Sequence, residues 1–234
     1  TAEVVDESRR TIVGTGQVLV ARAPFKVYAW LDRGHYNAGD TINASFSAQT
    51  IANKPVQGKG VVKLMKVSYT KDGKPIEKAV KTVNLDTDEE GRATLKLEAA
   101  EGGQYRLSYT VTDAKGHSIE GGYMFVIRDR KFDGGDFHFS KLELVPDKRE
   151  YAPGDTVKLL INVDKRDTTV ALFIRPANGV YLPPEFIRLD GKSAVHEIAI
   201  TKADMPNFFI EGLTIYDGRV HSVVKEIVVP PEKR

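Results

Sequence analysis

Apolar and polar residues alternate with a period of two along most of the chain. Every second residue between Thr41 and Gln49 is apolar, and residues 157–164 repeat this pattern. Such alternation is typical of a strand with one buried face. Residues 76–85 fit both helical spacing and alternation, and we interpret them as a strand because their surroundings are β. Further strands are predicted at 61–69, 93–97, 105–111, 123–127, 170–174, 194–200, 208–216 and 220–229.

Turn-forming residues separate these runs about every ten residues, as in a β-sandwich. Asp72-Gly73, Asp190-Gly191 and Asp217-Gly218 are pairs suited to type I′ hairpins, in which both central residues have positive φ. Residues 113–116 predict a slightly longer hairpin loop. The pattern as a whole predicts an all-β fold.

The chain contains an internal repeat. The pattern Tyr-x-x-Gly-Asp-Thr-aliphatic begins at Tyr36 and occurs again 115 residues later (36 to 151), at Tyr151. At the same offset Lys26 aligns with Lys141, and Asp32 aligns with Asp147. The apolar positions of the following strand also keep their phase. A repeat of domain length indicates two copies of one module.

The residue types of the repeated pattern predict a structural turn. Gly39 and Gly154 supply a backbone conformation that a Cβ atom disfavours. Asp40 and Asp155 can accept hydrogen bonds from nearby backbone N–H groups. We expect Tyr36 and Tyr151 to cap one end of each core.

These observations predict two tandem immunoglobulin-like antiparallel sandwiches, each with about seven strands in about 100 residues. The predicted segments are 24–130 and 137–234, joined by a linker at 131–136 that contains Gly134-Gly135. Residues 1–23, with short strands expected at 2–5 and 18–20, are interpreted as the last hairpin of a preceding domain. We expect some inter-domain motion unless Phe137 and Phe139 pack across the boundary.

Composition excludes several classes of function. With 34 basic and 32 acidic residues, the net charge of +2 gives no reason to expect nucleic acid or an anionic membrane as a partner. Asp129 interrupts the basic stretch at 128–131, which we interpret as the start of the linker. No run of about 18 apolar residues predicts membrane insertion. The absence of Cys removes disulfides, thiolate metal sites and Cys nucleophiles. The start at Thr1 indicates a processed chain or an excised piece.

No catalytic, cofactor or metal site is predicted. The five His residues do not pair at metal-ligand spacing, and no nucleophile elbow or phosphate-binding Gly-rich loop is found. These are His35, His117, His138, His196 and His221. Residues 86–91 fit the first half of a calcium-binding loop, but Leu97 occupies the twelfth position, where a Glu is required. An acidic hairpin loop explains them more simply. Asn43-Ala44-Ser45 matches the glycosylation triplet, which is a weak signal.

Two groups of aromatic residues are candidates for a partner surface. Phe137 and Phe139 lie near the linker, and Phe208-Phe209 lies in a predicted strand. Core and inter-domain packing is the simpler interpretation for all four. Trp30 is the only Trp, and its position in a predicted strand argues against an aromatic platform for glycans.

Several motifs, in their order and spacing, resemble the macroglobulin-like domains of the alpha-2-macroglobulin family, particularly of its bacterial branch. Val5-Asp6-Glu7-Ser8-x-Arg10 with Gly14-x-Gly16 is similar to the end of one such domain. Tyr36-x-x-Gly39-Asp40 and Tyr151-x-Pro153-Gly154-Asp155 are similar to domain starts. Thr87-Asp88-x-x-Gly91-x-Ala93 resembles a loop-to-strand pattern inside these domains. Residues 205–210 (Met-Pro-Asn-Phe-Phe-Ile) resemble a strand near their end.

The resemblance implies a non-catalytic scaffold segment of a broad-spectrum endopeptidase inhibitor that traps proteases, located in the periplasm, at the cell surface or in the secreted fraction. Its expected partners are proteases, through the full-length protein, and neighbouring domains of the same chain. The family's thioester Cys-x-Glu-Gln motif is absent here, because the chain has no Cys. Two alternatives remain open: a tandem adhesion or ligand-binding module, and accessory domains of a larger surface enzyme.

Overall fold

The computed structural model describes residues 2–5, 11–14, 22–176 and 182–231, the first two ranges as backbone only. A short antiparallel hairpin pairs β1 (Ala2–Val5) with β2 (Thr11–Gly14), and it forms a sheet of its own. The first strand agrees with the prediction for 2–5, whereas the strand expected at 18–20 lies outside the described residues. In the described ranges, no helix is long and apolar enough to cross a membrane.

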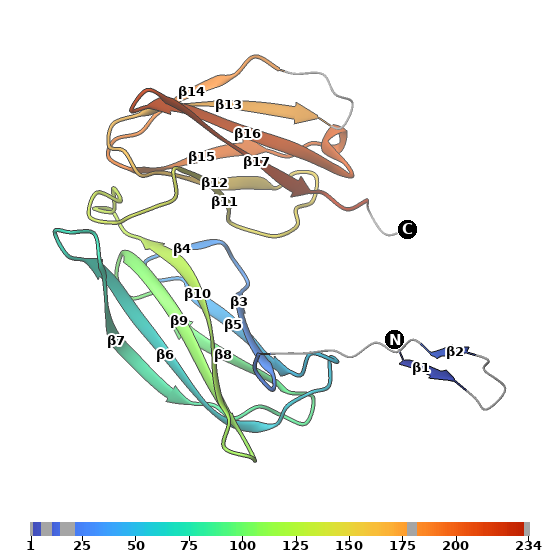
Figure 1. The fold of residues 1–234 in the computed structure, drawn as a ribbon. Helices are drawn as coiled ribbons and strands as arrows, with labels where there is room; N and C mark the ends of the chain where they lie inside the picture. The colour runs from blue at the N-terminus through green and yellow to red at the C-terminus, as the bar shows by residue number, and fades with distance from the viewer. Residues whose placement is uncertain (1, 6–10, 15–21, 177–181, 232–234) are drawn as a thin grey trace.

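The first sandwich packs a three-stranded sheet against a five-stranded sheet (Figure 1). The smaller sheet has the order β3 (Lys26–Leu31), β5 (Thr41–Gln49), β8 (Arg92–Glu98). The larger sheet has the order β4 (His35–Asn37), β10 (Ser118–Arg128), β9 (Gly103–Asp113), β6 (Gly58–Tyr69), β7 (Pro75–Asn84). All pairs are antiparallel except β4 with β10.

The second sandwich repeats this strand order. One sheet has the order β11 (Leu142–Pro146), β12 (Thr156–Val163), β15 (Ser193–Ala199). The other has the order β17 (Arg219–Val228), β16 (Asn207–Tyr216), β13 (Thr169–Pro176), β14 (Glu185–Arg188). A parallel bridge from Glu150 to Val228 occupies the place of β4. A 3-10 helix, η1 (Lys202–Asp204), precedes β16. The chain is therefore all-β, with immunoglobulin-like sandwiches.

Each sandwich has its own hydrophobic core, filled by the alternating residues of its strands. Ile42, Phe46 and Ala48 of β5 point into the first core, and Val157 and Ile161 of β12 into the second. Burial of one strand face fixes the register, because a slip of one residue would expose every apolar side chain. The alternation therefore positions the turns that connect these strands.

The structure forms one of the three predicted type I′ turns. Asp217 and Gly218 have φ values of 48° and 70°, as that turn requires. At Asp72-Gly73 only Gly73 has positive φ, because a longer loop forms. The N–H of Thr70 donates to the carbonyl of Lys74, and the N–H of Gly73 donates to the carbonyl of Thr70, each over 2.9 Å. Asp190-Gly191 connects β14 to β15, which lie in different sheets, so no hairpin forms there. The interpretation of both as type I′ hairpins was wrong.

Candidate functional site: the repeated corner and the junction

The repeated sequence pattern folds into the same hydrogen-bonded corner in both sandwiches. The hydroxyl of Tyr36 donates to Asp32 Oδ1 over 2.6 Å, and the hydroxyl of Tyr151 donates to Asp147 Oδ1 over 2.8 Å. The same carboxylate oxygen also accepts a backbone N–H from the following strand, that of Asn43 (3.0 Å) or Lys158 (2.8 Å). The acid before each Tyr therefore fixes the corner to the next strand.

The Gly-Asp pair of the pattern closes the turn. Gly39 and Gly154 both have φ of +93°, a conformation that side chains rarely adopt. Asp40 accepts the backbone N–H of Asn37 over 2.9 Å, and Asp155 accepts that of Ala152 over 3.2 Å. The predicted roles of both residue types are confirmed.

Burial and hydrogen bonding shift the pKa values of Tyr36, Tyr151 and Asp32. Burial, together with the nearby carboxylate, raises the pKa of both Tyr36 and Tyr151. Burial would raise the pKa of Asp32 as well, but hydrogen bonds from Asn43 and Tyr36 outweigh it and lower that pKa. The first corner therefore holds a neutral phenol that donates to an ionised carboxylate at neutral pH.

Replacing Tyr151 with Phe is expected to destabilise the second sandwich by about 1.5–3 kcal/mol, the usual range for a hydrogen bond to a charged group. The change also removes the acceptor of the Lys148 N–H, which lies 2.9 Å from the hydroxyl. Urea denaturation measures the loss. Tyr216→Phe is the control, because that hydroxyl donates over 3.1 Å to a neutral carbonyl, that of Lys141. Equal losses in the two variants would contradict a structural role for the corner.

The two corners meet at the boundary between the sandwiches. The N–H of Gly34 donates to the carbonyl of Asp147 over 3.2 Å, and His35 Nε2 lies 2.9 Å from the carbonyl oxygen of Lys158. Arg149 reaches back to the carbonyl of Leu31 at 3.5 Å. Gly34 and His35 align with Arg149 and Glu150 of the second corner (offset 115, as from Tyr36 to Tyr151). The second corner therefore forms without glycine or histidine at these positions, so neither residue type is required by the corner itself.

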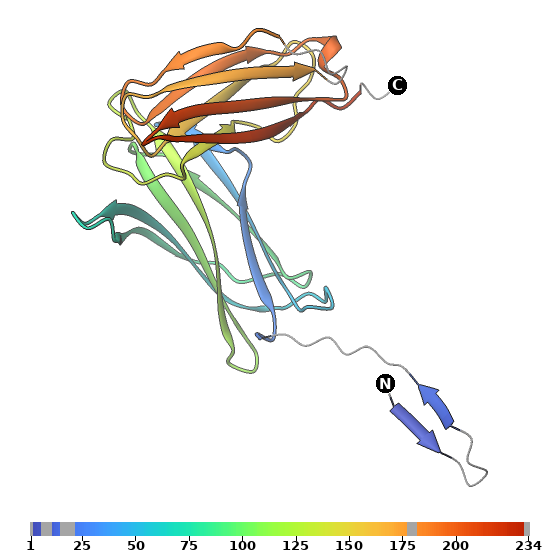
Figure 2. The ribbon, with the colours of Figure 1, turned by 45° about the horizontal axis from the view of Figure 1, so that its top comes forward.

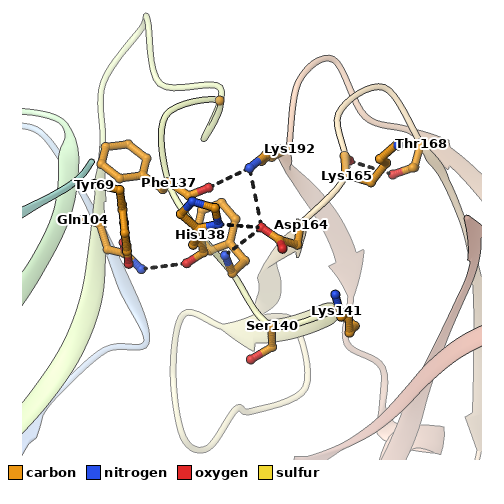
Figure 3. Close-up of polar contacts among 12 residues, drawn as sticks. Tyr69, Gln104, Phe137, His138, Ser140, Lys141, Asp164, Lys165, Thr168 and Lys192 are labelled. Atoms are coloured by element: carbon orange, nitrogen blue, oxygen red, sulfur yellow. Dashed lines mark hydrogen bonds and ion pairs between the residues drawn. The ribbon is translucent and has the colours of Figure 1, made fainter. Parts of the chain in front are cut away.

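The segment after the linker connects both sandwiches through polar contacts (Figure 3). The Tyr69 hydroxyl donates to Gln104 Oε1 over 2.8 Å, and Gln104 Nε2 lies 3.4 Å from the carbonyl oxygen of His138. On the other side, Lys192 Nζ donates to the carbonyl of Phe137 over 2.8 Å. His138 also contacts the Tyr69 ring edge-on. The segment is thus held by residues of both domains.

The predicted linker itself packs on the second sandwich. The backbone N–H of Lys192 donates to the carbonyl of Asp133 over 2.8 Å, and the Asp133 carboxylate pairs with Arg166 over 2.9 Å. A Cβ atom at Gly135 would lie 1.9 Å from a guanidinium nitrogen of Arg166. These contacts leave the linker little freedom.

Apolar side chains are also buried at the junction. Leu160 on β12 and Val126 on β10 are 1% and 6% exposed, yet neither belongs to a sandwich core. With Phe139 and Val145 they line a cavity of about 250 Å³ between the sandwiches. Phe139 thus faces a cavity that both sandwiches line, whereas Phe137 stacks on Phe132 of the linker with 5.5 Å between ring centroids. The restricted inter-domain motion stays a prediction.

The other histidines have local partners. His117 pairs with Asp113 (2.9 Å), His196 with Glu185 (3.0 Å), and His221 packs on the Tyr216 ring. Among the described residues, no group of three or more His, Cys, Asp or Glu side chains is arranged to hold a metal ion.

Asp86 and Asp88 in the acidic loop at 86–91 have protein partners. Asp86 pairs with Lys59 over 2.7 Å, and Asp88 Oδ1 accepts the backbone N–H of Arg92 over 2.7 Å. Asn43, in the glycosylation triplet, is exposed, and its amide donates to Asp32 Oδ2 over 2.8 Å. These side chains therefore stabilise turns and the corner.

The Phe208-Phe209 pair divides between the two faces of its sheet. Phe208 is buried in the second core, whereas Arg175 lies over the ring of Phe209 at 5.1 Å on the opposite face. On that opposite face Ile215 and Val220 are cross-strand neighbours and 65% and 62% exposed. The second sandwich therefore presents an apolar outer face.

The corresponding outer face of the first sandwich is polar. Arg106 of β9 forms ion pairs with Glu120 of the adjacent β10 (2.6 Å) and with Glu77 of β7 (2.7 Å), which lies beyond β6. The two modules thus share a fold but differ in the surface that they offer.

Comparison with known proteins gives similarity to three different groups. The model of the CopC domain matches residues 37–128, which is less than half of the chain and lies within the first sandwich. A comparison with curated proteins gives no match.

Among solved structures, the chain is similar to trypsin-activated alpha-2-macroglobulin from Escherichia coli (16% identity, TM-score 0.34, 92% of this chain and 16% of that chain). Salmonella alpha-2-macroglobulin reacted with methylamine gives 17% identity and a TM-score of 0.34, over 97% of this chain and 17% of that chain. A tetra-tandem repeat from the extending region of a large adhesion protein gives 12% identity and a TM-score of 0.31, over 96% of this chain and 54% of that chain. The chain spans about a sixth of the length of the alpha-2-macroglobulins. At these scores the matches assign neither family nor function.

Proposed function

We propose that this chain is a non-catalytic scaffold segment of an alpha-2-macroglobulin-like protease trap that acts outside the cytoplasm. The observation that carries the proposal is the docked pair of corners, in which backbone and side chains of both sandwiches meet at Gly34, His35 and Arg149. Such a pair keeps the orientation of two modules and passes a displacement of one to the other. The motifs that resemble macroglobulin-like domains support the same assignment.

The apolar outer face of the second sandwich supports a place within a larger assembly. Exposed apolar patches on a sheet face are typical of surfaces that pack against another domain. The exposed residues include Ile215, Val220 and Val224 on two adjacent strands, and Phe186 on β14. In the proposed trap, a neighbouring domain of the same protein covers this face.

Challenge of the longer protein that contains this chain with trypsin tests the proposal. A trap should be cut early at one place, after which the protease should lose activity on large protein substrates and keep it on small peptide substrates. A catalytically inactivated trypsin is the control, because without the cut no trapping should follow. Progressive degradation with unchanged activity on large substrates would reject the trap and favour an adhesion module or the accessory domains of a surface enzyme.

A further inference from the structure

His35 is a buried histidine at the contact between the two sandwiches. Its side chain is placed by β4, which runs parallel to β10, and the residue is 4% exposed. Nε2 lies 2.9 Å from the carbonyl oxygen of Lys158 in the other sandwich, so Nε2 carries the proton and donates. Nδ1 is buried and has no hydrogen-bond partner among the described residues.

The charged groups around His35 come from three elements. Asp147 lies on the turn after β11, Asp40 on the turn after β4, and Arg128 at the end of β10. Burial lowers the pKa of His35, and Arg128 adds to this effect, while the hydrogen bond to Lys158 and the two carboxylates oppose it. The net result is a neutral imidazole at neutral pH.

We propose that His35 makes the junction sensitive to pH: the neutral imidazole closes the contact between the sandwiches, and a second ring proton opens it. A proton on Nδ1 would place a charge and an unpaired donor inside the junction, next to the Arg128 guanidinium. A buried charge without a partner is costly, whereas the same imidazolium is well solvated once the sandwiches separate. This proposal concerns the junction and does not depend on protease trapping.

The direction of the effect follows from proton linkage. In separated sandwiches, His35 faces water and titrates near the ordinary value of about 6.5. The docked state has the lower pKa, so the separated state binds more protons below about pH 6.5. Docking is therefore at full strength above that pH and weakens as the pH falls towards the docked pKa, by at most about tenfold per pH unit.

A second histidine at the junction provides the comparison. His138 Nδ1 lies 3.5 Å from Asp164 Oδ1, and the His138 ring contacts the Tyr69 ring edge-on. Replacing His138 leaves the contact of His35 with the Lys158 carbonyl in place, so the two variants separate the proposal from a general effect of acid.

The absence of Cys allows a direct measurement, since two introduced cysteines are the only labelling sites. Lys78→Cys on β7 and Glu197→Cys on β15 are exposed positions, one in each sandwich. Spin labels at these sites should give one narrow distance distribution at pH 7.5 and a broad one at pH 5.0. With His35→Gln, whose amide can still donate but cannot titrate, the narrow distribution should persist at pH 5.0. With His138→Gln, the distance distribution should still broaden at pH 5.0, as in the unaltered junction.

A narrow wild-type distribution at both pH values would overturn the proposal. So would broadening of the His35→Gln variant at the wild-type midpoint, because carboxylates would then control the junction. If His35→Gln does not fold, the His35 ring resonances of the otherwise unaltered chain give the answer by NMR. Their titration midpoint should lie below 6.5 and coincide with the broadening; a midpoint at or above 6.5 would also reject the proposal.

Discussion

Phe46→Ala is expected to destabilise the first sandwich by about 3–5 kcal/mol and to leave the second sandwich nearly unchanged. Phe46 is 1% exposed and packs on the Tyr109 ring, with 4.5 Å between ring centroids. Removing a buried aromatic side chain costs the lost transfer free energy and leaves a cavity in the core. Thermal unfolding measures the loss of stability. Hydrogen exchange of the backbone amides of β5, in the first sandwich, and of β12, in the second, then assigns the loss to one sandwich.

The internal repeat provides a matched control. Ile161 occupies the position of Phe46 in the second copy and is 0% exposed. Ile161→Ala should destabilise the second sandwich by about 2–5 kcal/mol and spare the first. If either substitution lowered the protection of both sandwiches equally, the two cores would form one cooperative unit, and the description as two modules would be wrong.

Gly34→Val is expected to separate the sandwiches while each stays folded. A Cβ atom at this position would lie 2.2 Å from the carbonyl oxygen of Pro146 and 2.7 Å from Val145 Cγ1. Neither neighbour is the end of a flexible side chain, so the second sandwich has to move away. In the second copy, Arg149 occupies the position that aligns with Gly34, which shows that the corner itself accepts a side chain. Spin labels at Lys78→Cys and Glu197→Cys should then give a broad distance distribution at pH 7.5.

Lys158→Ala is the control for this prediction. His35 contacts the backbone carbonyl of Lys158, and the Lys158 side chain is exposed, so its removal should leave the distance narrow. A narrow distribution in Gly34→Val, with both sandwiches folded, would show that the close contact at Gly34 does not hold the junction.

The strands that bury one face were predictable from the sequence, because burial imposes a period of two. β5 (Thr41–Gln49) begins and ends where the alternation does. β7 (Pro75–Asn84) was correctly interpreted as a strand although its pattern was ambiguous. It is an edge strand that is exposed along almost its whole length, so no buried face determines its pattern.

Two short strands inside the sandwiches, β4 and β14, escaped the prediction. β4 (His35–Asn37) has three residues, too few to show a period, and its parallel pairing with β10 depends on the tertiary fold. β14 (Glu185–Arg188) is equally difficult to recognise, since it has four residues at the edge of its sheet. Only the packing of the whole sandwich defines these strands.

The corner was largely predictable and the junction was not. Tyr36, Gly39 and Asp40 belong to the repeated pattern, and their residue types indicate a turn. Gly34 and His35 lie outside that pattern, and contacts between domains follow no period. The aligned positions in the second copy hold Arg149 and Glu150, but the two copies differ at most aligned positions, so this difference does not point to the contact.

The two views of the molecule show the sandwiches stacked with β11 and β12 facing the first sandwich (Figures 1 and 2). Residual dipolar couplings of the backbone amides of both sandwiches, measured at pH 7.5, test this fixed arrangement most directly. The account predicts that one alignment tensor fits both sandwiches in the orientation described here. Two tensors of clearly different magnitude would show independent tumbling and would contradict the docked junction.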